Sequence, residues 1–125
     1  MITGAVNSLR RPTITVALID EEGEIRSLEA HLDTGFTGEL TLPASAIKQL
    51  GLPFSATTSF RTASSRLTDF RTYEGEILWH GRRRIIDVLE SEVFPLVGVG
   101  LLWDNNLSID FKLGGDVAIT ELPES

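Results

Sequence analysis

Apolar and polar positions alternate along most of this chain, which is the pattern of strands with one face in a core and one in water. The run TITVALI at residues 13–19 shows it most clearly, because β-branched residues fill most of it. Similar short runs recur with a turn signal about every ten residues, which predicts an all-β barrel or sandwich. The predicted strands cover residues 2–7, 13–19, 24–32, 39–42, 57–61, 69–79, 84–90, 94–99, 107–111 and 117–122.

One segment departs from this alternation and predicts the one main short helix of the chain. Apolar residues at 44–50 share a helical face, Pro43 suits the first turn, and Gly51 suits the C-terminal stop. A further turn or two of helix is expected at residues 100–105, with Asn105 and Asn106 as its stop.

Length and charge restrict the classes of function. The 125 residues predict a single domain over residues 1–125, long enough to bury roughly two thirds of the surface of the unfolded chain. The net charge is −7, with 18 acidic and 11 basic residues, and phosphate binding needs a cationic face. We therefore expect no nucleic acid as a partner.

Cysteine and apolar-run content set further expectations. The chain has no cysteine, which excludes disulfides and thiolate chemistry and fits a cytoplasmic protein. Its first residues, MITGAVNSLRR, lack the apolar core of a signal peptide, and no run is long enough to span a bilayer. We expect no membrane partner.

The stretch LDTGFTGELTLP at residues 32–43 carries the candidate chemistry. It fixes the carboxylate of Asp33 at the end of a predicted strand, beside Thr34 and Gly35. Asp and Gly are also common turn residues, so the tripeptide alone is a weak signal that favours a turn ending a strand over a catalytic site. Its context decides between the two interpretations.

Hydrolysis of a peptide bond by carboxylates needs two of them sharing one proton, because two carboxylates about 3 Å apart cannot both ionise. The chain holds Asp-Thr-Gly once, and its other aspartates lie in turn-like surroundings or on strands with a solvated face. They are Asp20, Asp69, Asp87, Asp104, Asp110 and Asp116. A two-fold dimer would bring Asp33 of both subunits to its axis and so complete the pair.

The motif and its surroundings resemble the retropepsin-like (clan AA) aspartic proteases, and are most similar to the small single-domain bacterial and cyanobacterial group. HLDTGFTGELTLP, IKQLGLP and the later PLVGVGLL carry the resemblance, which covers nearly the whole chain. It implies a closed retropepsin-type acid protease barrel with a single lobe, active as a homodimer. It also implies an aspartic endopeptidase that needs no metal and no other cofactor.

The resemblance assigns roles to residues around the motif. Asp33 would be the catalytic aspartate, Thr34 would hydrogen-bond across the dimer axis, and Gly35 would let the backbone turn and present its amide to the carboxylate. A second structural motif would pack beneath this loop, formed by Leu96, Val97 and Gly98. The two chain ends would pair with those of the other subunit in an interface sheet.

The resemblance also implies a flap over residues 57–79 that closes on an extended peptide or protein substrate. Its tip reads Ala63-Ser64-Ser65, where relatives often have Ala-Asp-Gly, so we expect a stiffer tip. Phe36 replaces a small residue after the motif and should narrow the cleft. Tyr73 on the returning flap strand is a further candidate for substrate contact.

Other residues have a structural explanation that is preferred to a functional one. His31 shares a strand face with Asp33, and a structural role is preferred over tuning of the aspartate. His80 is expected to be exposed in a turn, and the run at residues 82–84 to be a solvated strand end. Trp79 and Trp103 are expected to anchor the core or an interface.

The alternative function is a dimeric peptide- or protein-binding module on the same fold with weak or no catalysis. A fold does not guarantee an activity. The altered flap tip favours this alternative, and only an assay of cleavage separates it from the protease.

Overall fold

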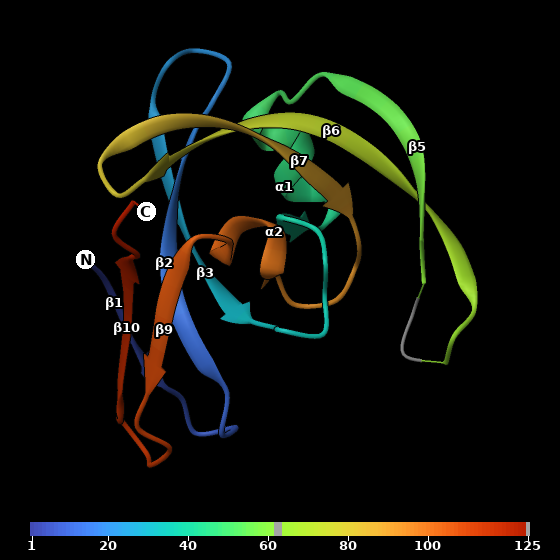
Figure 1. Ribbon diagram of the computed structural model, residues 1–125. Helices are drawn as coiled ribbons and strands as arrows, with labels where there is room; N and C mark the ends of the chain where they lie inside the picture. The colour runs from blue at the N-terminus through green and yellow to red at the C-terminus, as the bar shows by residue number, and fades with distance from the viewer. Residues whose placement is uncertain (62–63, 125) are drawn as a thin grey trace.

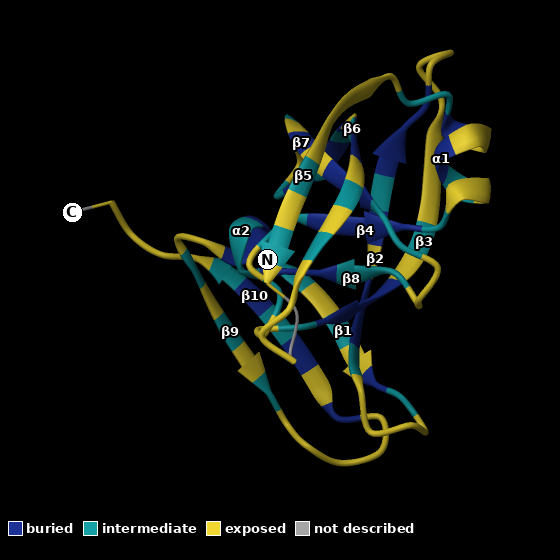
Figure 2. Ribbon diagram, turned by 90° about the vertical axis from the view of Figure 1, so that its right-hand side faces the viewer, coloured by how far each residue is buried: buried dark blue, intermediate teal, exposed yellow. Residues whose placement is uncertain are grey.

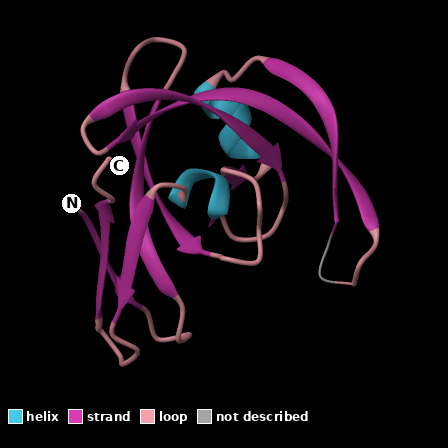
Figure 3. Ribbon diagram, viewed as in Figure 1, coloured by secondary structure: helices cyan, strands magenta, loops and turns pink. Residues whose placement is uncertain are grey.

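The computed structural model describes residues 1–61 and 64–124, and within them the chain is mostly β with two short helices (Figure 1). The strands are β1 (Ile2–Val6), β2 (Pro12–Ile19), β3 (Ile25–Leu32), β4 (Leu40–Leu42), β5 (Phe54–Arg61), β6 (Leu67–Trp79), β7 (Arg82–Glu90), β8 (Leu96–Val97), β9 (Asn105–Ile109) and β10 (Asp116–Glu121). The helices are α1 (Ala44–Leu50) and α2 (Val99–Leu102). Figure 3 shows how strands dominate the chain, and Figure 2 shows α1 at the outer edge of the molecule with one face exposed.

The strands form one hydrogen-bonded sheet in the order β5-β6-β7-β4-β8-β3-β2-β1-β10-β9. β2 also pairs with β6 in antiparallel orientation. In this pairing Ala17 lies opposite Leu78, and Ile19 lies opposite Glu76. The pairings β2–β3–β8–β4–β7–β6–β2 therefore return to the strand where they begin, and each of the six strands in this circuit contributes side chains to the apolar core.

The core is built from the inward faces of these strands together with α1 and α2 (Figure 2). Leu18, Leu40, Ile77 and Val97 come from four different strands and have no exposed surface. The last three residues of β3, at positions 30–32, are buried in this packing, so the loop that follows β3 leaves from a rigid base.

The β2–β3 hairpin is held by the carboxylate of Asp20. Its Oδ1 accepts the amides of Glu22 and Glu24, both at 2.9 Å, and its Oδ2 accepts the Arg26 guanidinium at 3.0 Å. These bonds, the Glu24 amide first, lower the pKa of Asp20 below its usual value. The buried aspartate is thus a structural residue, as its turn-like sequence context indicated.

The chain ends are paired with each other inside the subunit. β1 lies between β2 and β10, and β10 lies between β1 and β9, so both edges of each terminal strand are occupied. The expectation that the chain ends pair with a second subunit stays a prediction, and this pairing within the subunit argues against it for most of both strands. Among the strands that the structure describes, β5 and β9 stand at the ends of the order.

Several element bounds differ from the sequence expectation. α1 has the predicted bounds and ends at Gly51, which has a φ of 68°. In contrast, β5 begins at Phe54 instead of residue 57, because a largely exposed strand at the edge of a sheet has no alternating pattern to detect. Strand β8 keeps only Leu96 and Val97 of the predicted 94–99, since the chain enters α2 directly after Gly98.

Candidate active site

Strand β3 delivers the Asp-Thr-Gly loop, and β8 holds the loop in place. The Asp33 amide donates to the Val97 carbonyl at 2.9 Å, and the His31 amide donates to the Pro95 carbonyl at 2.8 Å. β3 and β8 are parallel here, with Leu32 beside Val97. The backbone of Asp33 is therefore fixed by a strand that comes from a distant part of the sequence.

The carboxylate of Asp33 is oriented from within the loop. The Gly35 amide donates to Asp33 Oδ1 at 2.8 Å, and the Phe36 amide donates to the Asp33 carbonyl at 3.2 Å. Asp33 is half-buried, while Thr34 and Gly35 are exposed. The loop thus presents an ordered carboxylate and an exposed Thr34 at the surface of the subunit.

The side chain of Phe36 packs directly against two glycines, Gly38 and Gly98. A Cβ on Gly38 would lie 2.4 Å from the Phe36 ring, and a Cβ on Gly98 would lie 2.5 Å from the ring and 2.3 Å from the Gly38 carbonyl oxygen. The Val99 amide also donates to the Phe36 carbonyl at 2.8 Å. Only glycine at positions 38 and 98 lets the loop and its aromatic ring approach the β8–α2 junction this closely.

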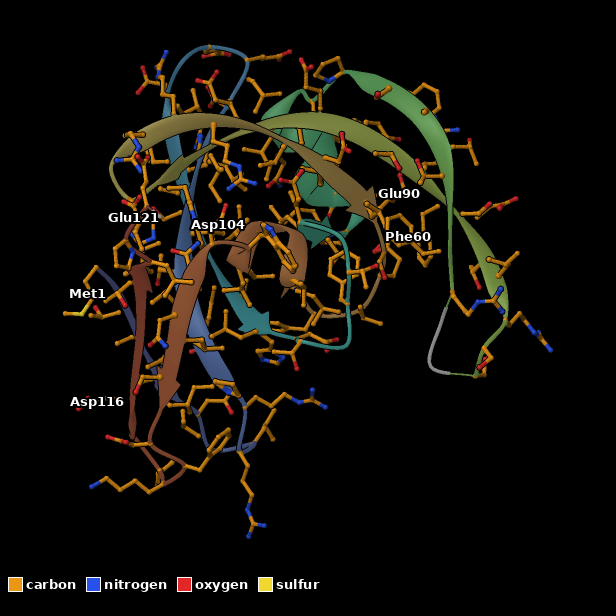
Figure 4. The ribbon with its side chains drawn as sticks, in the orientation of Figure 1. Met1, Phe60, Glu90, Asp104, Asp116 and Glu121 are labelled. Atoms are coloured by element: carbon orange, nitrogen blue, oxygen red, sulfur yellow. The ribbon has the colours of Figure 1, made fainter. Side chains whose placement is uncertain are left out.

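A cavity of about 320 Å³ lies beside Asp33 and beneath the β5–β6 hairpin. Its lining consists of Asp33, Gly35, Phe36, Thr37, Thr41, Phe60, Arg61, Phe70, Leu89, Ser91 and Leu96. The hairpin projects from the body as an arm, and Figure 4 shows Phe60 on the inner side of its curve, facing the loop after β3.

An aromatic cluster joins the hairpin to the motif loop across this cavity. The ring centroids of Phe36 and Phe60 are 6.0 Å apart, and those of Phe60 and Phe70 are 6.2 Å apart. Such tilted and edge-on pairs are favourable arrangements of aromatic rings. Part of the cavity lining is therefore an apolar wall of three aromatic rings, and Arg61 is the cationic residue of the lining.

Not all predicted site residues meet in this cavity. Tyr73 lies on β6 outside the lining, where its hydroxyl donates to Glu90 Oε1 at 3.2 Å and accepts the Arg71 guanidinium at 3.1 Å. Ser64 and Ser65 follow β5 at the hairpin tip, and the Ser65 carbonyl accepts Arg61 Nη1 at 2.7 Å. Ala63 is outside the residues that the structure describes.

The sequence interpretation missed several lining residues because they come from distant strands. Thr41 is on β4, Phe60 on β5, Phe70 on β6 and Leu89 on β7. One sequence signal could have identified two of these lining residues, namely an aromatic residue on each strand of the β5–β6 hairpin between polar neighbours. Phe60 and Phe70 fit that description, and an apolar ring on a solvated hairpin indicates a contact beyond the hairpin.

The histidine and tryptophan expectations had mixed outcomes. His31 is buried and stacks on Phe94 with ring centroids 3.8 Å apart, in agreement with a structural role. His80 was expected to be exposed, but its side chain is only 5% exposed and its Nε2 lies 2.7 Å from Asn105 Oδ1. Trp79 is buried in the core, whereas Trp103 is 68% exposed and is not a core residue.

Asn105 and the arginines at positions 82–84 had different outcomes from each other. Asn105 begins β9 and does not stop a helix. The arginines at 82–84 lie at the start of β7 as expected, and each pairs with a glutamate: Arg82 with Glu121 at 2.7 Å, Arg83 with Glu76 at 3.4 Å and Arg84 with Glu39 at 2.9 Å. Arg82 lowers the pKa of Glu121 by a hydrogen bond.

Two further properties concern metals and membranes. Within residues 1–61 and 64–124, no group of three His, Asp or Glu side chains is arranged to hold a metal ion. Neither helix in the described part of the chain has the length and apolar character that crossing a bilayer requires.

Comparison with known proteins identifies the fold. No protein-family model matches the sequence, and no curated protein matches it. Among solved structures, the chain is similar to the crystal structure of a retropepsin-like aspartic protease from Rickettsia conorii, with a TM-score of 0.62 and 17% sequence identity. The match covers 97% of this chain and 92% of the other. This chain therefore has the fold of a retropepsin-like aspartic protease.

Proposed function

We propose that this chain is an aspartic endopeptidase in which Asp33 from two subunits forms the catalytic pair. One observation carries the proposal. An Asp-Thr-Gly carboxylate, oriented by the Gly35 amide at 2.8 Å, borders a cavity roofed by a hairpin, in a chain with the fold of a retropepsin-like protease. On this proposal the six-strand circuit is the closed barrel of that class, and β5–β6 is its flap.

The proposed reaction is acid–base hydrolysis of a peptide bond. A water molecule lies between two Asp33 carboxylates, one ionised and one protonated. The ionised carboxylate takes a proton from the water as the oxygen attacks the scissile carbonyl carbon, and the protonated one donates a hydrogen bond to the carbonyl oxygen. Breakdown of the tetrahedral intermediate returns a proton to the leaving nitrogen.

The proposed substrate is an extended peptide or a protein segment. It would lie beneath the hairpin as an added strand and bind largely through main-chain hydrogen bonds. The aromatic wall of Phe36, Phe60 and Phe70 would then receive an apolar side chain close to the scissile bond. No metal or organic cofactor takes part in this scheme, and the cytoplasm remains the expected location.

The test is digestion of a peptide library by the wild type and by Asp33→Asn. Asparagine keeps the shape of the side chain but cannot share or transfer the proton. We therefore expect cleavage to fall by about 10²–10⁴-fold or more, since that is the usual contribution of a general acid–base group. Circular dichroism and solution mass should be unchanged. Equal cleavage by both proteins would refute the proposal.

A binding module with little turnover is the second candidate, and one observation favours it. Phe60 of the hairpin contacts Phe36 of the motif loop across the cavity, so the cleft is narrow without a substrate. A wild type that retains library peptides but cleaves none of them between about pH 3 and about pH 8 would establish this candidate.

A further inference from the structure

Three apolar side chains protrude from two neighbouring loops at one end of the molecule. Leu9, in the loop between β1 and β2, is 72% exposed. Phe111 and Leu113, in the loop between β9 and β10, are 73% and 77% exposed. We call these three residues, with the loops at 7–11 and 110–115 that carry them, the tip patch. Clustered exposed apolar residues of this kind mark interaction surfaces.

The two loops form one preorganised unit. The Val6 amide donates to the Gly115 carbonyl at 3.0 Å, and the Gly114 amide donates to the Val6 carbonyl at 2.9 Å. Within the first loop, Asn7 Oδ1 accepts the amides of Leu9 at 2.9 Å and of residue 11 at 3.0 Å. A rigid loop loses little conformational entropy when its apolar side chains are covered.

The unit also contains a hollow. A cavity of about 410 Å³ lies between the loops, lined by Val6, Asn7, Ser8, Arg10, Phe111, Lys112 and Leu113. The tip patch therefore offers protruding apolar side chains and an adjacent recess. A surface with both features can bind a copy of itself, because a two-fold interface places each protrusion against the partner's recess.

The tip patch shares a side of the molecule with the proposed catalytic loop. In Figure 1 the turns between β1 and β2 and between β9 and β10 lie at the bottom of the view, and the loop after β3 lies above them with its lower edge open to the same side. Figure 2, turned about the vertical axis, again has both turns at the lower end. A second subunit on this side can contact the tip patch while its own Asp33 loop approaches this one.

The charges on the two loops favour a second copy over an anionic surface. Arg10, Arg11 and Lys112 in the two loops supply three positive charges, and Asp110 in the second loop and Asp116 at the adjoining start of β10 supply two negative charges. All five residues are exposed. Both signs on one patch allow opposite charges to meet in a two-fold pairing. A lipid surface or nucleic acid would attract the cations but repel the aspartates.

We infer that the tip patch is the surface through which two copies of this chain associate, in place of pairing between terminal strands. The inference rests on the proposed two-subunit function, because one chain supplies one Asp33. Both edges of β1 and of β10 are already occupied within the subunit. The loops beside them are the part of this end that remains uncovered.

The test is the mass of the protein in solution, measured by light scattering after size exclusion over a range of concentrations. The variants are Leu9→Asp, Phe111→Asp and Leu113→Asp, together with the milder Phe111→Ser. Ile25→Asp is the matched control, because Ile25 is 59% exposed and lies at the other end of β3 from the motif loop. Circular dichroism checks that each variant is folded, and the high exposure of these positions favours folding.

We expect the wild type and Ile25→Asp to be dimers. The dimer dissociation constant of the Leu9→Asp, Phe111→Asp and Leu113→Asp variants should be about tenfold higher than that of the wild type or more, as for residues at the centre of an interface. A wild type that stays monomeric at every concentration, or patch variants that dimerise like the control, would overturn the inference. So would binding of the wild type, but not of Phe111→Asp, to vesicles of anionic lipid with no effect on mass.

Solution mass does not depend on catalysis, so the two proposals fail separately. A dimer that needs the tip patch but cleaves no peptide refutes the endopeptidase and keeps the interface. Cleavage that persists in patch variants of unchanged mass refutes the interface and keeps the endopeptidase.

Discussion

At the scale of single residues, the site depends on how the chain limits the freedom of one carboxylate. Asp33 is held at its backbone by β8 and at its side chain by the Gly35 amide. Because Gly38 and Gly98 have no side chain, the Phe36 ring can pack directly against both of them. The carboxylate is thus preoriented before any partner or substrate arrives, which is how a site avoids the cost of reorganisation.

His31 illustrates a residue beside the site whose ionisation matters for stability. Burial lowers the pKa of its imidazole below the ordinary 6.5, and the positive charge of Arg11 adds to the effect. The unfolded chain takes up a proton near that value, whereas the folded chain does so only at lower pH. The unfolded state therefore binds more protons in this window, and the free energy of unfolding falls as the pH falls.

We expect His31→Phe to weaken this dependence. Phenylalanine keeps the apolar burial and the stacking on Phe94 but has no group to protonate. The free energy of unfolding from urea titrations should fall less for the variant than for the wild type between about pH 7 and about pH 5. Parallel curves for the two proteins would mean that His31 is not protonated differently in the folded and unfolded chains.

Residue-level expectations from the sequence succeeded where local chemistry decides the outcome. The Asp33 carboxylate meets the Gly35 amide two residues away, which the turn chemistry of Asp and Gly indicates. His80 was expected to be exposed and its side chain is buried, because its exposure depends on distant residues. Trp103 is not in the core, and its role as an interface anchor stays a prediction. Asn105 covers His80 from the start of β9, and nothing in the sequence around position 80 announces that contact.

At the scale of elements, helix α1 and the central strands could be predicted, and the site elements only in part. α1 has local start and stop signals in Pro43 and Gly51. Strand β8 is only two residues long, and its identity depends on parallel pairing with β3 across the fold. Short non-local elements of this kind carry no periodic pattern, although this one positions the Asp33 loop.

The β8–α2 junction gives a prediction at this scale. A Cβ at position 98 would lie 2.3 Å from the Gly38 carbonyl oxygen, which is backbone and cannot rotate away. Gly98→Ala should therefore lower the free energy of unfolding by about 1–3 kcal/mol, the usual cost of overpacking, and shift the Asp33 loop. Cleavage per folded molecule should fall as well.

Gly23→Ala is the comparison for that variant. Gly23 has a φ of 83° in the β2–β3 turn, and a Cβ there would meet no atom within 4 Å. Alanine at this position should cost about 1 kcal/mol through backbone strain, with no change in cleavage by the folded protein. If Gly98→Ala were as active per folded molecule as Gly23→Ala, the junction would not position the catalytic loop.

At the scale of the whole molecule, the single Asp-Thr-Gly makes the proposed activity a property of two chains. A mixture of wild type and Asp33→Asn separates this arrangement from a site complete in one subunit. The substitution leaves the proposed interface untouched, so the two proteins should exchange subunits freely. Each mixed dimer would contain one aspartate and one asparagine and would lack the shared proton.

The amount of activity lost then follows from random pairing. When an equal amount of Asp33→Asn is added to a fixed amount of wild type, about half of the wild-type homodimers become mixed dimers, and cleavage should fall to about half. The double variant Asp33→Asn/Phe111→Asp, which we expect to associate poorly, should cause almost no loss at the same concentration. Activity that stays constant when Asp33→Asn is added, after enough time for exchange, would place the whole catalytic apparatus within one subunit and contradict the two-chain site.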